Sequence, residues 1–409
     1  MPTTDFIVYR SRWRMLLVFM FIIAMNQVCW ITFAPITSKA AQFFGVSELK
    51  IGLLSMSFMI IYLFVAIPAS WVIDTYGFRV AVGTGAVLTG IFGLLRGLSP
   101  ANYTLVLVAQ IGIAIGQPFV LNSLTKVAAR WFPLTERATA TGLGTLAMYL
   151  GIIVGMFLTP LLTIKYGLRQ MLLFYGIVSV FSAITFLAFA REHPPTPPCP
   201  AGHEERSLML DGLKNVFRQK DFILLLFIFF IGLGIFNAVS TWIEMIIRPR
   251  GFSISQAGVL GGLMVTGGIV GAVVLPLFSD RSHRRKPFII LGLIGTALGL
   301  LGMTSAAHYG LLLFSGFLFG FCLLGVGPIG FQFGAEMTYP APEGTSNGLL
   351  LLSGQVSGII GIFAMDMTKS AATGSMTAAM FVLIGFVLVC CLVSLKLRES
   401  LLLKETQQG

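Results

Sequence analysis

The sequence predicts an all-α membrane protein of twelve transmembrane helices, arranged as two pseudo-symmetric six-helix bundles. Composition is the first observation behind this prediction, because 56% of the 409 residues are hydrophobic and only 11% are charged. Soluble domains carry about 25% charged residues, and a mean hydropathy of +0.89 also lies far on the apolar side. Recurring apolar runs and an internal repeat are the other two observations.

Twelve apolar runs have the length of about 20 residues that a helix needs to cross a bilayer. They do not alternate apolar with polar residues as β-barrel strands do, and backbone groups in lipid must be satisfied within the segment, so we expect helices. The first run is too long for a cleaved signal peptide. The runs are approximately 15–37, 51–73, 79–99, 104–126, 138–163, 170–190, 221–246, 255–279, 287–307, 310–334, 345–366 and 374–396.

Lys and Arg are distributed unequally between the two sides of these spans. If the N-terminus is cytoplasmic, 19 of the 27 basic residues lie on the cytoplasmic side and 8 on the other. The positive-inside rule therefore predicts that both termini are cytoplasmic in a multi-pass protein of the plasma (inner) membrane. The net charge of +11 follows from this topology, and no basic stripe remains that would indicate nucleic-acid binding.

A polar segment, 191–220, divides the first six runs (1–190) from the last six (221–409). Its proline-rich start predicts a stiff cytoplasmic linker. The later stretch SLMLDGLKNVF can form an amphipathic helix on the membrane surface or remain an unstructured linker. We therefore expect an N-terminal six-helix bundle, a linker and a C-terminal six-helix bundle.

The two halves share features at one offset of 206 residues. The loop DTYGFR falls on DRSHRR, RATATG falls on EGTSNG, and Gly155 falls on Gly361. Agreement at several places with a single shift indicates an internal repeat. A Gly-rich run, 258–274, also has the small-residue spacing that allows close helix packing.

The acidic-then-basic loop between the second and third spans of each half can act as a latch. Its Asp can pair with an Arg or with a neighbouring helix N-terminus on the cytoplasmic rim. The alternative is that these charges only set topology, but two loops in register favour the latch. His283 and its neighbours replace the glycine in the second loop, which predicts a weaker latch there. The gating candidates are Asp74, Arg79, Asp280, Arg285, Glu336 and Glu343.

Twelve spans in two parallel halves with these loops resemble the major facilitator superfamily. The resemblance implies the major facilitator fold, with a substrate site near mid-membrane between the bundles, lined by the first, fourth, seventh and tenth spans. Polar residues interrupt the middle of several spans. They are Asn26, Gln27 and Trp30 in the first, Gln117 and Asn122 in the fourth, Asn237, Ser240 and Thr241 in the seventh, Gln332 in the tenth and Gln355 in the eleventh.

Each of these amides could instead be an interhelical hydrogen bond, which contributes about 0.6 kcal/mol without any substrate. Their recurrence at similar depth favours a site. Trp30 adds to this, because Trp normally gathers at membrane interfaces. We therefore expect Asn26, Gln27 and Trp30 to face a solvent-reachable chamber between the bundles.

Three stretches are similar to a narrower branch, the one named for the feline leukaemia virus subgroup C receptor. They are NQVCWITFAPI, GQPFVLNSLTKVAARWF and GPIGFQFGAEMTYPAPEGTSNGLL. Members of this branch are linked to haem export and to choline and ethanolamine uptake. The resemblance implies a quaternary-ammonium cage of Trp30, Gln117, Gln355 and an aromatic residue of the seventh span. Asn237 stands at that aromatic position, so one cation–π wall is replaced by an amide.

The sequence indicates neither a cofactor nor a proton motor. The four histidines lie in loops or at span ends, which disfavours haem ligation, and we expect no cofactor or metal. Carboxylates are nearly missing from the span interiors, which favours facilitated uniport over proton coupling. Glu336 is the best proton-site candidate, with pairing to a basic gate residue as its alternative. Arg96, near a span end, is expected to snorkel to the membrane surface.

We therefore predict a secondary transporter that moves a small organic cation or zwitterion by alternating access. A proton-coupled multidrug or metabolite exporter is the alternative. No phosphate-binding GK[ST] loop or catalytic constellation indicates an enzyme. The expected partners are a small-molecule substrate and the lipid bilayer, with no nucleic acid, and the expected state is a monomer.

Overall fold

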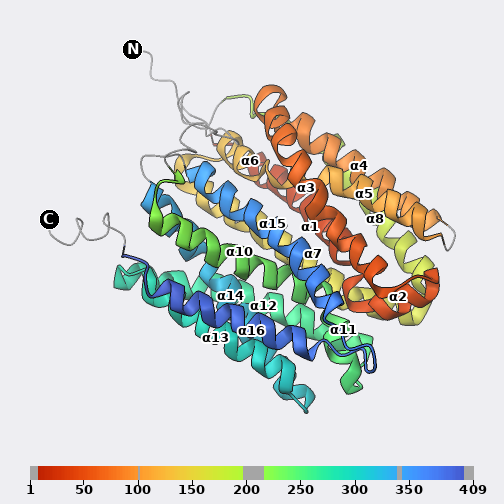
Figure 1. Cartoon of the computed structure of the whole chain (residues 1–409). Helices are drawn as coiled ribbons and strands as arrows, with labels where there is room; N and C mark the ends of the chain where they lie inside the picture. The colour runs from red at the N-terminus through yellow and green to blue at the C-terminus, as the bar shows by residue number, and fades with distance from the viewer. Residues whose placement is uncertain (1–7, 100–101, 197–215, 339–342, 400–409) are drawn as a thin grey trace.

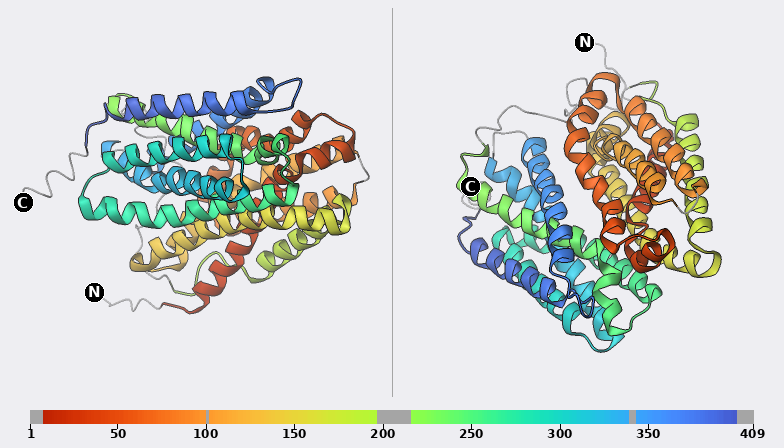
Figure 2. Two further views of the ribbon diagram at one scale, coloured as in Figure 1. Left: turned by 90° about the horizontal axis from the view of Figure 1, so that it is seen from below. Right: turned by 45° about the vertical axis from the view of Figure 1, so that its right-hand side comes forward.

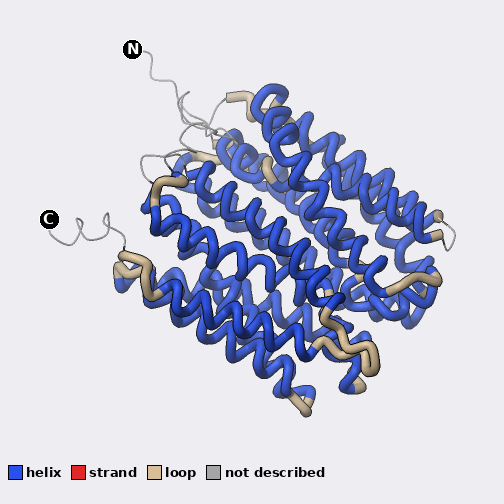
Figure 3. Tube along the Cα trace, in the orientation of Figure 1, coloured by secondary structure: helices blue, strands red, loops and turns tan. Residues whose placement is uncertain are grey.

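The computed structural model describes residues 8–99, 102–196, 216–338 and 343–399, and all regular structure in these ranges is helical (Figure 3). Twelve of the helices are long and apolar enough to cross a membrane, which confirms the prediction of twelve spans. Much of the expected linker, with most of SLMLDGLKNVF, lies outside the described residues.

The twelve long helices form two groups that lie side by side (Figures 1 and 2). In the N-terminal bundle α4 packs against α8 and α5, and α1 packs against α7; in the C-terminal bundle α14 packs against α12 and α13, and α10 packs against α15. The first bundle contains α1 (Ser11–Ile31), α3 (Glu48–Tyr76), α4 (Phe78–Leu98), α5 (Tyr103–Leu121), α7 (Arg137–Tyr166) and α8 (Leu168–Phe189). The second contains α10 (Lys220–Thr241), α12 (Ile254–Ser282), α13 (Lys286–Ser305), α14 (Tyr309–Thr338), α15 (Glu343–Met367) and α16 (Thr377–Ser394).

Short helices mark the two ends of the bundles. We call the end where the described chain starts and finishes the terminal face, and the end that carries α2 and α11 the distal face (Figure 1). The short elements are η1 (Ala34–Ile36), α2 (Thr37–Phe44), α6 (Leu124–Trp131), η2 (Leu134–Glu136), α11 (Ile243–Ile247) and η3 (Arg248–Arg250).

The glycine-rich run predicted to pack closely does so on α12. A Cβ at Gly271 would lie 2.0 Å from the carbonyl oxygen of Phe321 on α14, and one at Gly258 would lie 2.4 Å from that of Met156 on α7. Neither position can hold a side chain without moving a backbone. Because α7 belongs to the N-terminal bundle, the same run of small residues brings α12 against both its own bundle and the other one.

The first span differs from its sequence expectation. We predicted one run from about 15 to 37, whereas α1 ends at Ile31 and a turn leads through η1 into α2. Pro35 lies in η1 and has no N–H to continue an α-helix. The turn carries α2 across the distal face toward the C-terminal bundle, where η1 and α2 contact α11.

Candidate substrate site and gates

The two bundles meet mainly along α7 with α12 and along α3 with α15. Trp242 of the C-terminal bundle is fully buried, and its indole Nε1 donates to the carbonyl oxygen of Ile362 at 3.1 Å. A Cβ at Gly52 of α3 would lie 2.7 Å from the Trp242 ring, so this ring fits against the backbone of the other bundle. The bundles therefore touch through complementary apolar surfaces.

Trp30 lies in a hydrophobic cluster of buried residues that extends through both bundles. The cluster also contains Met59 of α3 and Phe236 of α10, and the Trp30 side chain is 7% exposed. The ring is therefore packed inside the protein and does not face lipid. The role of Trp30 in substrate binding remains a proposal, which we take up below.

Asn237 also lies at the contact between the bundles. Its Nδ2 donates to the carbonyl oxygen of Gly354 on α15 at 3.2 Å, one residue before Gln355. A Cβ at Gly358 would lie 2.8 Å from Asn237 Nδ2 and 2.9 Å from the sulfur of Met59 on α3. The structure thus brings Asn237 beside the Gln355 segment and within reach of the opposite bundle.

Asn26 has a different environment from the one expected. Its side chain is 0% exposed, and Nδ2 donates to Oγ1 of Thr89 on α4 at 3.2 Å, inside the N-terminal bundle. The expectation that solvent reaches Asn26 is wrong, because α4 covers it. This contact is an interhelical hydrogen bond, which is the alternative to a substrate site that we gave for these amides.

The remaining polar candidates of the N-terminal bundle are also largely covered. Gln27 is 3% exposed and Gln117 is 7% exposed. Asn122 accepts a hydrogen bond from the Tyr62 hydroxyl at 2.9 Å and donates to Ser70 at 3.2 Å, so it links α3 to the end of α5. Asn122 therefore contributes to packing within the bundle.

The distal face contains a hydrogen-bonded link that sequence reasoning missed. Glu244 of α11 accepts from the backbone N–H of Ser38 at 2.9 Å and from its hydroxyl at 2.7 Å. Burial raises the pKa of the Glu244 carboxyl, while the two bonds from Ser38 act in the opposite direction. The bonds join α2 of one bundle to α11 of the other.

Ion pairs extend this link across the distal face. Glu48 at the start of α3 pairs with Arg248 at 2.8 Å and with Lys369 at 2.8 Å. Lys369 also pairs with Asp366 of its own bundle at 3.4 Å. In the sequence these residues appear only as charges at span ends. The partners are up to 321 positions apart, so no local sequence pattern predicts their pairing. We call Ser38, Glu48, Glu244, Arg248 and Lys369 the distal gate.

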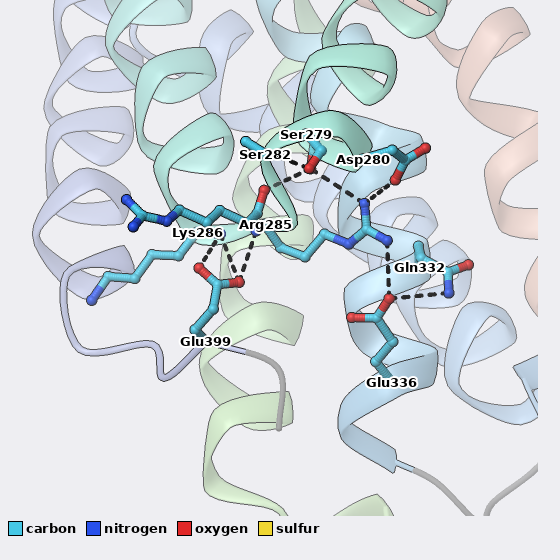
Figure 4. Close-up of polar contacts among 9 residues, drawn as sticks. Ser279, Asp280, Ser282, Arg285, Lys286, Gln332, Glu336 and Glu399 are labelled. Atoms are coloured by element: carbon cyan, nitrogen blue, oxygen red, sulfur yellow. Dashed lines mark hydrogen bonds and ion pairs between the residues drawn. The ribbon is translucent and has the colours of Figure 1, made fainter. Parts of the chain in front are cut away.

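The terminal face of the C-terminal bundle carries a cluster around Arg285 (Figure 4). Arg285 binds Asp280, pairs with Glu336 at 3.1 Å and donates to the Ser279 hydroxyl at 3.3 Å. Gln332 donates to the same Glu336 oxygen at 3.2 Å. The second loop therefore forms the predicted pair between its Asp and Arg. Glu336 pairs with a basic residue, which is the alternative role that we gave it beside that of a proton site.

The first loop is arranged differently. Asp74 pairs with Lys126 of α6 at 3.5 Å, whereas the Arg79 side chain is exposed. We expected the second latch to be the weaker one, but Arg285 bridges two carboxylates there. His283 adopts φ +52°, so it accepts the left-handed turn that usually requires glycine. The side chain of Glu343 lies outside the described residues.

Each bundle carries an equivalent helix-capping carboxylate on this face, which we did not predict. Glu192 accepts from the backbone N–H groups of Phe78 at 3.2 Å and Arg79 at 2.7 Å, at the N-terminus of α4. Glu399 accepts from the backbone N–H groups of Arg285 at 2.7 Å and Lys286 at 3.4 Å, at the N-terminus of α13. Both acids stabilise the positive end of a helix dipole. The shift from Glu192 to Glu399 is 399 − 192 = 207, one residue more than the offset of the repeat, so the two capping contacts lie at nearly equivalent positions of the two halves.

The chain belongs to the major facilitator superfamily, whose pattern matches residues 16–362. It is therefore a multi-pass membrane transporter. It is 32% identical to solute carrier family 49 member A3 of Xenopus tropicalis, over 90% of this chain and 80% of that protein. It is 30% identical to the human choline/ethanolamine transporter FLVCR2, over 86% of this chain and 71% of that protein.

These relatives confirm the resemblance to the feline leukaemia virus receptor branch. A solved structure of similar fold is the inward-facing, unoccupied form of a bacterial homologue of the human lysosomal transporter Spinster. It superposes with a TM-score of 0.73 at 15% identity, over 95% of this chain and 98% of that one. The all-helical, two-bundle architecture predicted from the sequence is thus that of a known transporter fold.

Proposed function

We propose that this transporter carries a small organic cation or zwitterion with an ammonium group, by alternating access. The burial of the Trp30 ring in a hydrophobic cluster that extends through both bundles carries the proposal. A cation over a tryptophan ring gains up to about 2 kcal/mol when it is desolvated. The relative FLVCR2, named as a choline/ethanolamine transporter, supports the same substrate class.

The Asn237 amide favours an ammonium group that retains N–H bonds. Its nitrogen donates to the Gly354 carbonyl, and its oxygen Oδ1 has no hydrogen-bond partner among the described residues, so it remains available as an acceptor. An amide oxygen can accept from a primary ammonium but gains nothing from a trimethylammonium group. We therefore propose that ethanolamine-like amines are preferred over choline, with Gln117 and Gln355 as further polar contacts.

The distribution of bonds supports alternating access. With the termini in the cytoplasm, the distal face is the outer one, and the distal gate closes it in this structure. Opening requires the bonds of Glu48 and Glu244 to break. The ion pairs Asp74–Lys126 and Arg285–Glu336 on the terminal face each join residues of one bundle, so separating the bundles there does not break these two pairs.

The carboxylates support facilitated uniport. Each carboxylate whose side chain the structure describes has a hydrogen-bond or ion-pair partner, for example Glu336 with Arg285 and Glu136 with Arg12. A proton-coupling site usually needs a carboxyl group that is buried and able to titrate. Glu244, buried between the bundles, is the observation that keeps the proton-coupled exporter as a second candidate.

Uptake of radiolabelled ethanolamine and choline into proteoliposomes tests this proposal. Trp30→Ala is expected to raise KM about thirtyfold, which corresponds to a loss of about 2 kcal/mol. Trp71→Ala is the matched control, since Trp71 is 58% exposed on α3. Equal uptake by the two variants would refute the substrate site, and a strong dependence on an imposed pH gradient would refute uniport.

Asn237→Phe tests the specificity proposal separately. Restoring an aromatic wall is expected to shift the ratio of choline to ethanolamine uptake at least fivefold toward choline, because the acceptor oxygen is replaced by a ring. An unchanged ratio in a variant with normal expression and melting temperature would place Asn237 outside the site.

A further inference from the structure

Arg96, in the last turn of α4, is a buried cation without a carboxylate partner. It is 0% exposed, its Nε is buried without a hydrogen-bond partner, and among the described residues it forms no ion pair. The expectation that Arg96 snorkels is therefore wrong. A guanidinium remains charged in proteins, and an intramembrane charge is costly, so its retention requires strong compensation.

The compensation comes from the end of α1. Arg96 Nη1 donates to the backbone carbonyl of Cys29 at 3.0 Å and to Oε1 of Gln110 at 2.8 Å. Gln110 Nε2 donates to the same Cys29 carbonyl at 3.1 Å. The last carbonyls of a helix carry partial negative charge and have no helical partner. They are therefore suited to a buried cation.

The turn after α1 contributes the remaining contacts. Thr32 donates to the carbonyl of Val28 at 2.6 Å and accepts from Arg96 Nη2 at 3.4 Å. The Arg96 guanidinium also lies 5.6 Å from the centre of the Phe33 ring. Side chains from α4, α5 and the turn thus replace the backbone bonds that are lost where α1 stops.

This capped turn lies between the proposed substrate site and the distal gate. Trp30 immediately follows the Cys29 carbonyl that Arg96 binds, and η1 leads from the turn into α2, where Ser38 bonds to Glu244. We propose that Arg96, with Gln110, is a positioning residue that locks this turn. It fixes the orientation of Trp30 relative to α2, so that binding at the site and opening of the gate are coupled. The part concerning Trp30 rests on the proposed function.

A distance measurement across the distal face tests the lock without any substrate. Spin labels are placed on exposed positions of the two bundles by Gln42→Cys on α2 and Ala372→Cys after α15, with reactive native cysteines replaced by serine. Arg96→Met is expected to raise the ratio of gate-open to gate-closed molecules about tenfold or more. This is the scale expected when a hydrogen bond to a charged group is lost.

Arg169→Met is the matched control, because Arg169 is exposed at the start of α8 near the same face. It should leave the distances unchanged. Arg96→Lys keeps the charge but not the forked donor geometry, so it should give an intermediate ratio. If Arg96→Met cannot be purified, the gate-open ratio of Arg96→Lys decides whether Arg96 locks the turn.

Wild-type distances in Arg96→Met or Arg96→Lys, with only a lower melting temperature, would overturn the proposal by showing a purely structural role. Transport assays distinguish a failure of this inference from a failure of the proposed function. If the wild-type protein moves neither ethanolamine nor choline, the proposed substrate fails while the distance result still stands. If it does move them, Arg96→Met should also raise KM, because Trp30 is released.

Discussion

The two faces of the molecule are held together in different ways. On the distal face, Ser38 and Glu48 of the N-terminal bundle bond to Glu244, Arg248 and Lys369 of the C-terminal bundle. On the terminal face, the ion pairs Arg12–Glu136, Asp74–Lys126, Arg285–Asp280 and Arg285–Glu336 each join residues of one bundle. The distal bonds must break if the bundles separate there, whereas separation at the terminal face does not break these four ion pairs.

The difference assigns separate roles to charges that look alike in the sequence. The Arg285 cluster joins α12 to α14 within one bundle, and Glu192 and Glu399 cap the starts of α4 and α13. If the bundles alternate as we propose, Glu48 and Glu244 instead set the balance between their two arrangements. Variants of the first kind should change stability, and variants of the second kind should change conformation.

The largest effect is expected from Arg285→Met. The Arg285 and Glu336 side chains are 9% and 8% exposed, so removing the guanidinium leaves a buried carboxylate unpaired. Breaking such a pair costs about 3–5 kcal/mol. Unfolding in mixed micelles should show this loss, while distances across the distal face should stay as in the wild type.

The double variant Arg285→Met with Glu336→Met is the control for that interpretation. It removes both buried charges, so part of the lost stability should return. If the double variant is no more stable than Arg285→Met, the Arg285–Glu336 ion pair is not the source of the stability that the cluster contributes.

Glu48→Gln should have a smaller and different effect. Its ion pairs with Arg248 and Lys369 are partly exposed, and such pairs contribute up to about 1 kcal/mol each. We expect about fivefold more gate-open molecules with little change in stability. Asp366→Asn is the matched control, because Asp366 pairs with Lys369 inside one bundle. A similar shift in both variants would contradict the role of cross-bundle pairing.

The smallest effect concerns pH. Burial raises the pKa of Glu244 in the closed gate, where Arg248 and Glu48 are the nearest charged groups. In an open gate water would return this pKa toward its ordinary value, so the closed gate binds the proton more tightly. Lowering the pH should therefore favour closure about twofold, and raising it should favour opening. Glu244→Gln should abolish this dependence, and a dependence that persists would assign it to another group.

Sequence reasoning succeeded where the information is local. Apolar run length predicted twelve spans, the small-residue run predicted the close approach at Gly258 and Gly271, and the Asp280–Arg285 pair lies within one loop. It failed where the partner is distant. No local pattern shows that Arg96 meets the Cys29 carbonyl or that α4 covers Asn26.

Two distances in one protein test the central claim that the bundles alternate as units. One label pair spans the distal face, at Gln42 and Ala372, and one spans the terminal face, at the exposed Thr75 and Arg281. Alternation predicts that Glu48→Gln lengthens the distal distance and shortens the terminal one in the same fraction of molecules. If the distal distance lengthens while the terminal distance stays fixed or also lengthens, alternation is contradicted.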